Sequence, residues 1–170
     1  MKGKIKITDF KNHQEFEDNL ICKIEEIINE SDLEKKYSLI IDYICDFLDA
    51  EMMKHNYCDF QDGKCIANRL GKTVRVENGC CYKSKVGLCK HLNNGCCLNK
   101  NIACKLFFCR YLEGKGVKYN IRRAFPVKLV FNKKQIGILE KKYFKAKEEI
   151  IDVLIKNERR QRIWTLELGI

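Results

Sequence analysis

Nine of the eleven cysteines in this 170-residue chain fall between residues 58 and 109. Thiolates can bind metals, attack electrophiles or exchange electrons, and closely spaced thiolates are typical of zinc and iron–sulfur sites. Each kind of site takes about four such ligands, so nine cysteines suffice for two sites with one left over. The cysteines of this segment are Cys58, Cys65, Cys80, Cys81, Cys89, Cys96, Cys97, Cys104 and Cys109.

The cellular compartment decides whether such thiols stay reduced. Residues 1–10 carry basic side chains with no continuous apolar stretch behind them, so we expect no secretory signal. No later run approaches the roughly 18 apolar residues of a membrane helix. We therefore expect a cytoplasmic protein without a membrane partner. In that reducing environment a dense cysteine cluster is more often metal-binding than disulfide-linked, and an odd total leaves one thiol unpaired in any all-disulfide scheme.

A partial repeat lies inside the cysteine-rich segment, where residues 58–69 align with residues 89–100 at a spacing of 31. Cys58 and Cys65 coincide with Cys89 and Cys96 in this alignment. Each unit consists of a cysteine, a turn and a second cysteine. This order predicts that the chain brings two sulfur atoms back towards one point.

The later cysteines follow an order known from other proteins. It consists of Cys80-Cys81, Cys89-x-x-Leu92, Gly95-Cys96 with Leu98, and Cys104-Lys105-Leu106-Phe107-Phe108-Cys109. This order resembles the YkgJ-like cysteine-rich family, which is described as a zinc- or iron-chelating domain. The likeness covers about 30 residues, or about 60 if Cys58 and Cys65 stand for the leading cysteines of the family.

The chain departs from that family pattern in two ways. The leading pair is separated by six residues instead of two, and Asn101-Ile102-Ala103 stands where the family usually has a proline. The resemblance implies metal binding and leaves any reaction unspecified. The ligands predicted for zinc or an iron–sulfur cluster are Cys58, Cys65, Cys80, Cys81, Cys89, Cys96, Cys104 and Cys109.

Other candidate ligands are less favoured. Cys97 is predicted to be the spare cysteine, because its neighbour Cys96 fits both the repeat and the family order. Cys22 and Cys45 lie in helical patterns among apolar residues, so we expect both to be small buried hydrophobes.

Two histidines lie near the cysteines. We interpret His91 as a packed or solvent-facing residue instead of a ligand. His55, three residues before Cys58, is a slightly better ligand candidate by spacing alone.

The segment before the cysteines is predicted to be helical. After a short strand at residues 4–7, apolar spacing of three and four residues indicates a helix over about 12–30. Ser31 followed by Glu34 is a capping-box pattern, so a second helix should begin at about Asp32. The apolar face of this second helix comprises Leu33, Tyr37, Ile40, Ile41, Ile44, Leu48 and Met52.

The segments after residue 57 are predicted differently. Residues 58–109 lack apolar periodicity apart from a hairpin at about 73–79, so metal–thiolate bonds should order them. Alternation over residues 127–131 predicts a strand with Pro126 near its start, and a helix should follow from about Lys134. The chain is thus predicted to be α+β, with segments 1–57, 58–109 and 110–170 forming one compact domain.

Charge is unevenly distributed along the chain and leaves two further hypotheses open. Residues 1–57 carry 8 Lys/Arg against 13 Asp/Glu, residues 58–109 carry 9 against 3, and residues 110–170 carry 16 against 7. A basic C-terminal half could bind nucleic acid or an acidic protein partner. A third hypothesis is an iron–sulfur or thiol redox enzyme, which we favour less because no Gly-rich phosphate loop, H-E-x-x-H motif or paired carboxylates accompany the cysteines.

Overall fold

The computed structural model describes residues 23, 27, 29–72, 82–83, 87–88, 91–93, 96–117, 120–122 and 124–167. Within this part of the chain the strands are two residues long and pair as β1–β2 and β3–β4, while helices dominate. The predicted α+β class is therefore wrong. The elements are α2 (Leu33–His55), α3 (Ile66–Arg69), β1 (Tyr82–Lys83), β2 (Gly87–Leu88), β3 (Leu92–Asn93), β4 (Cys96–Cys97), α4 (Ile102–Lys105), α5 (Arg110–Gly114), α6 (Phe125–Val130), α7 (Lys133–Leu139) and α8 (Lys147–Glu167).

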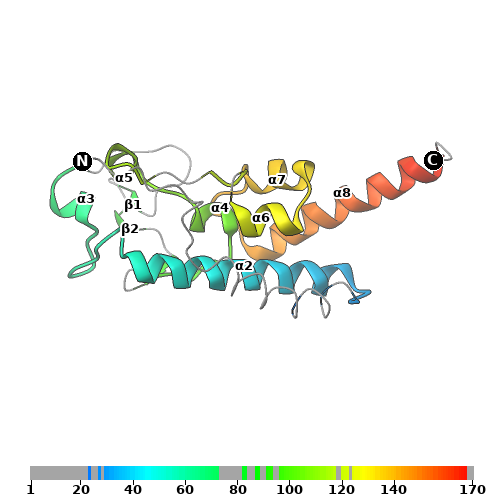
Figure 1. Cartoon of the computed structure of the whole chain (residues 1–170), viewed down its shortest axis with the longest axis horizontal. Helices are drawn as coiled ribbons and strands as arrows, with labels where there is room; N and C mark the ends of the chain where they lie inside the picture. The colour runs from blue at the N-terminus through cyan, green and yellow to red at the C-terminus, as the bar shows by residue number, and fades with distance from the viewer. Residues whose placement is uncertain are drawn as a thin grey trace.

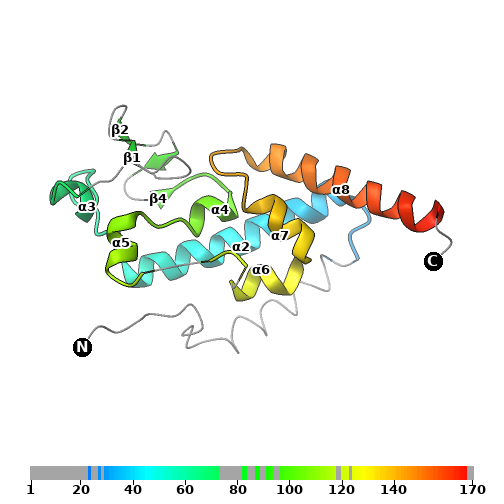
Figure 2. The same ribbon diagram turned by 90° about the horizontal axis from the view of Figure 1, so that it is seen from above.

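Helix α2 is the element on which the other helices pack. It contacts α4, α6 and α8, while α7 joins α6 to α8 (Figures 1 and 2). The side chain of Asp32 accepts hydrogen bonds from the backbone N–H groups of Glu34 and Lys35 and so caps the helix. The predicted start at about Asp32 is confirmed, although Asp32 and not Ser31 provides the cap. Asn56 ends the helix in a left-handed conformation with φ of 44°.

The main core forms along the predicted apolar face of α2. Ile41, Ile44 and Leu48 are at most 1% exposed, and burial of each such side chain contributes about 1.5–3 kcal/mol. Cys45 is fully buried on the same face, as predicted for a small hydrophobe. The partners of this face come from four helices: Ile102 and Ala103 of α4, Val127 of α6, Ile136 and Leu139 of α7, and Ile150, Ile151 and Leu154 of α8.

The strand predicted over residues 127–131 is instead the helix α6. A strand would place Val127, Leu129 and Phe131 on one face, but Leu129 is 49% exposed while Val127 and Phe131 are buried. The spacing of four residues between the buried pair is that of one helix face. Pro126 stands in the first turn, where its missing N–H costs no hydrogen bond and its fixed φ suits a helix. The alternation was a helical pattern read over too short a window.

The single helix predicted from about Lys134 is two helices. Asn132 and Gln135 form a capping box at the start of α7, which ends at Leu139. Phe144 then adopts a positive φ of 60°, a conformation that bulky side chains disfavour and that cannot continue a helix. The chain resumes as α8 at Lys147. Residues 140–146 therefore turn between α7 and α8, which contact each other.

The end of the cysteine-rich segment is not poor in core residues, contrary to the prediction. Ile102, Ala103 and Leu106 belong to the main core. Phe108 forms a second, smaller cluster with Leu112 and Val117. The spacing Ile102, Ala103, Leu106 is that of a buried helix face, but a run of only four helical residues is too short to be detected by periodicity. Ordinary apolar packing thus orders residues 102–108.

Several predictions lie outside the described residues. These are the strand at 4–7, the hairpin at about 73–79 and most of the helix at 12–30, of which only Lys23 and Ile27 are described, both in helical conformation. None of the helices in the described ranges combines the length and the apolar character that crossing a membrane requires.

Candidate metal centre

Residues 58–66, which we call the first cysteine loop, fold back on themselves. Gln61 and Lys64 exchange backbone hydrogen bonds of 3.0 and 2.9 Å across the two-residue turn Asp62-Gly63. Both turn residues have positive φ, 50° and 73°, which is the geometry of a tight hairpin turn. Ile66 N–H then donates to the carbonyl of Cys58 at 2.8 Å. The predicted order of cysteine, turn and cysteine is confirmed here, and it brings the backbone next to Cys65 back to Cys58.

Arg69 clamps the first cysteine loop from the adjacent helix α3. Its Nη1 donates to the carbonyl of Asp59 and, at 3.0 Å, to that of Lys64, while Nη2 lies 2.5 Å from Asp59 Oδ2. These bonds connect the two arms of the loop on either side of the turn. Planar guanidinium is suited to such multiple contacts. The loop is therefore held by polar contacts within 12 residues of chain, residues 58–69.

Residues 91–98, the second cysteine loop, form a hairpin from β3 and β4. Leu92 pairs with Cys97 and Asn93 pairs with Cys96 in antiparallel register. Leu98 N–H donates to the carbonyl of His91 at 2.8 Å. This bond closes the second loop as the bond from Ile66 to Cys58 closes the first. Both loops lie around the C-terminal end of α2 (Figure 2).

Two of the predicted ligands pack together in the smaller apolar cluster. Cys58 and Cys109 are both half-buried against Phe108, Leu112 and Val117. Cys109 also stands at the N-terminal cap position of α5. The structure thus brings a cysteine of the first loop close to the last cysteine of the segment, across 51 positions of sequence. Cys65 stands in the corresponding cap position of α3 and is half-buried as well.

Cys104 lies apart from that cluster, on α4. It is 9% exposed, and its Sγ accepts a hydrogen bond of 3.2 Å from the backbone N–H of Phe144. Burial, with a smaller effect of the neighbouring Cys104, raises the pKa of the Tyr143 hydroxyl. Cys104 therefore faces the turn between α7 and α8.

Asn101, which stands where the resembled family has a proline, places Cys104 in that position. It is fully buried, and its Oδ1 accepts from Cys104 N–H at 3.1 Å to cap α4. Its Nδ2 donates to the carbonyls of Lys142 and Lys145 at 2.5 and 3.0 Å. An unsatisfied buried amide would cost about 1–3 kcal/mol, so these bonds fix α4 to the 142–145 turn. Proline has no side-chain amide to make them.

The remaining predicted ligands are not brought together in the described part of the chain. Cys80, Cys81 and Cys89 lie outside it, and nothing is placed for the side chain of Cys96. Among the described residues, no group of three or more His, Cys, Asp and Glu side chains has the arrangement of a metal site. His55 stacks on Tyr57 with ring centroids 4.9 Å apart, and His91 contributes its carbonyl to the second loop.

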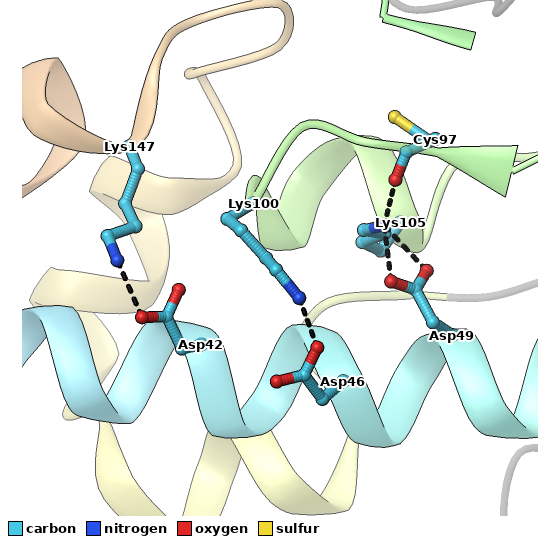
Figure 3. A network of polar contacts seen from close by, with 7 residues as sticks. All are labelled: Asp42, Asp46, Asp49, Cys97, Lys100, Lys105 and Lys147. Atoms are coloured by element: carbon cyan, nitrogen blue, oxygen red, sulfur yellow. Dashed lines mark hydrogen bonds and ion pairs between the residues drawn. The ribbon is translucent and has the colours of Figure 1, made fainter. Parts of the chain in front are cut away.

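Three aspartates on one face of α2 join the helix to the segments that follow it (Figure 3). Lys147 Nζ lies 2.6 Å from Asp42 Oδ2, and Lys100 Nζ contacts Asp46 Oδ1. The spacing of the aspartates, four and then three residues, places them in line along the helix. Burial by itself would lower the pKa of Lys100, but the hydrogen bond and charge of Asp46 raise it overall. The sequence pattern Asp-x-x-x-Asp-x-x-Asp was the available signal for this acidic line.

Lys105 makes the third and most buried contact with this line. Its side chain is only 2% exposed, and its Nζ lies 2.6 Å from both carboxylate oxygens of Asp49. The same Nζ donates to the carbonyl of Cys97 in the second cysteine loop. An ammonium group so deeply buried is stable only with such partners. Lys105 is thus the residue that connects the second loop to α2.

Comparison with known proteins gives no match to this chain among family models, curated proteins or solved structures.

Proposed function

We propose that this protein binds zinc or an iron–sulfur cluster through its central cysteines in the cytoplasm. The observation that carries the proposal is the first cysteine loop, where a tight turn and the Arg69 clamp bring the chain at Cys65 back to Cys58. Paired ligands delivered from a turn are typical of structural zinc sites. The resemblance of the later cysteines to the YkgJ-like family supports the same chemistry. The ligand candidates are Cys58, Cys65, Cys80, Cys81, Cys89, Cys96, Cys104 and Cys109.

The cluster around Phe108 supports the proposal further. It places Cys109 beside Cys58 in an apolar, partly buried environment. Such surroundings limit the access of water and favour compact metal–thiolate bonds over solvated thiolates. Each thiol must lose its proton to bind, so binding releases protons and weakens at low pH. The proposal assigns no reaction to the bound metal.

The direct test is elemental analysis of protein purified without oxygen. We expect stoichiometric zinc or iron, and absorbance near 400 nm if the metal is an iron–sulfur cluster. Cys58→Ser and Cys65→Ser should each lower the metal content. Cys45→Ala is the matched control, because Cys45 is fully buried in the main core. Protein without metal whose cysteines all titrate freely would contradict the proposal.

A second candidate function is binding of nucleic acid or an acidic protein. It rests on Lys128 of α6 and on Lys133 and Lys134 of α7, which are exposed on two helices in contact. If these lysines contact phosphates, retention on nucleic acid should fall steeply with salt. The triple variant with glutamine at the three positions should reduce both the retention and its salt dependence, while metal content stays constant. Equal retention of the variant and the wild type would exclude this surface.

A further inference from the structure

The two cysteine loops can be aligned by their backbone hydrogen bonds instead of by their cysteines. In the first loop the last pair before the turn is Gln61–Lys64, and Cys65 follows it. In the second loop the last pair is Asn93–Cys96, and Cys97 follows it. Cys97 is therefore the counterpart of Cys65, and Cys96 is the counterpart of Lys64.

A second pair of hydrogen bonds gives the same alignment. The residue after Cys65, Ile66, donates its N–H to the carbonyl of Cys58 at 2.8 Å. The residue after Cys97, Leu98, donates its N–H to the carbonyl of His91, also at 2.8 Å. The structural spacing of the two loops is thus 32 residues, one more than the spacing of 31 by which their cysteines match.

A shift of one residue matters in a hairpin because successive residues alternate between its two faces. Cys96 and Cys97 are neighbours on β4, so only one of them can occupy the place that Cys65 occupies in the first loop. Identity of the two loops in sequence favours Cys96. Their backbone geometry favours Cys97.

Lys105 provides independent support, because it holds Cys97 in place. Its Nζ donates to the carbonyl of Cys97 and pairs with the Asp49 carboxylate on α2 (Figure 3). A side chain that is 2% exposed has little freedom to move. The position of the Cys97 backbone is therefore determined by the helical body and not by the hairpin alone.

We propose that Cys97, and not Cys96, supplies the thiolate ligand of the second cysteine loop, and that Lys105 is its positioning residue. This inference rests on the proposed metal binding and replaces one member of its ligand set. It takes as ligand the metal that Cys65 takes in kind, zinc or the iron of a cluster. Cys96 is then the spare cysteine of the segment.

The first test uses the wild-type protein as purified. Alkylation with N-ethylmaleimide, followed by peptide mass mapping, measures how far bound metal protects each thiol. We expect Cys65 and Cys97 to be protected in the metal-loaded protein and modified after chelation, and Cys96 to be modified in both states. Protection of Cys96 with modification of Cys97 would overturn the inference while leaving metal binding intact. Equal modification of all three thiols before and after chelation would overturn both.

The second test uses matched variants. Cys97→Ser should lose as much metal as Cys65→Ser, whereas Cys96→Ser should retain the wild-type content. Circular dichroism of each variant controls for folding, and the alkylation result stands even if Cys97→Ser fails to fold. Lys105→Met should bind metal at least tenfold more weakly and restore little of it at higher pH, because the defect is in position and not in protonation. Equal losses from Cys96→Ser and Cys97→Ser, or unchanged metal affinity of folded Lys105→Met, would contradict the assignment.

Discussion

Helix α2 takes part in two regions that are stabilised by different interactions. Along most of its length it packs on α4, α6 and α8 through a continuous apolar core. Around its C-terminal end lie the two cysteine loops, which are held by tight turns and by Arg69 and Lys105 (Figure 1). Apolar packing is non-directional and tolerates substitution of similar volume. Turns and buried ion pairs depend on individual groups, so single changes should affect the loops more selectively.

The two loops also differ from each other. Arg69 holds the first loop through contacts within that loop and its own helix α3. Lys105 holds the second loop through a contact with Asp49, 56 residues away in sequence. The first loop can therefore form locally, whereas the second needs the docked helix α2. The experiments below separate the helical body from the loops, and the first loop from the second.

Metal removal should have the largest effect. A structural tetrathiolate site contributes on the order of 10 kcal/mol, comparable with the stability of a whole domain of this size. Chelation should therefore open protease cleavage at Lys64 and Arg69 before cleavage within residues 33–52, while circular dichroism shows that much of the helical signal remains. Protease mapping with and without chelator measures the order of cleavage. Continued protection of Lys64 and Arg69 without metal would show that the turn and the arginine clamp hold the first loop unaided.

Removal of the buried charge at Lys105 should be the most disruptive single substitution. Lys105→Met leaves the Asp49 carboxylate without its partner, which in buried pairs costs about 3–5 kcal/mol. Urea denaturation measures this loss in the free energy of unfolding. Lys100→Met is the matched control, since Lys100 also pairs with α2 but its partner Asp46 is 65% exposed. We expect the control to lose at most about 1 kcal/mol. Equal losses would mean that the two contacts stabilise the fold alike.

Truncation in the helical body should lower stability without removing metal. Leu48 is 1% exposed in the main core, and Leu48→Ala should destabilise the protein by about 2–5 kcal/mol through lost burial and a cavity. Metal content measured well below the melting temperature should match the wild type. Leu129→Ala, at a residue 49% exposed on α6, should change stability by less than about 0.5 kcal/mol. Metal loss in folded Leu48→Ala would show that the body and the loops are not separable.

The buried thiol of Cys45 should produce a smaller, pH-dependent effect. Burial raises its pKa from 9.0 to about 12. The unfolded chain therefore loses this proton at lower pH than the folded protein. Stability should fall as pH rises from about 9 to 12, by about 1.4 kcal/mol per pH unit. Below pH 9 the contribution is constant. Denaturation of the wild type and Cys45→Ala at pH 8 and pH 10 measures the difference, and parallel losses in the two proteins would contradict it.

Some features were determined by the sequence itself because they depend on residues close together in the chain. The start of α2 follows from Asp32 and the N–H groups two and three residues after it. Its buried face follows from the spacing of Tyr37 to Leu48. The first cysteine loop follows from Asp62-Gly63, whose positive φ values few other residue pairs adopt easily. These interactions are complete within a few residues, so their pattern is visible without the fold.

Other features were decided only by tertiary structure. The alternation around Leu129 predicted a strand, and burial of Val127 and Phe131 against the main core made it a helix. The short helix α4 carries too few residues for a periodic signal and is ordered by packing on α2. The position of Cys97 depends on Lys105 and Asp49, which meet only when α4 docks on α2. Contacts between distant segments leave no local pattern, because neither partner's neighbours reveal where the chain will place the other.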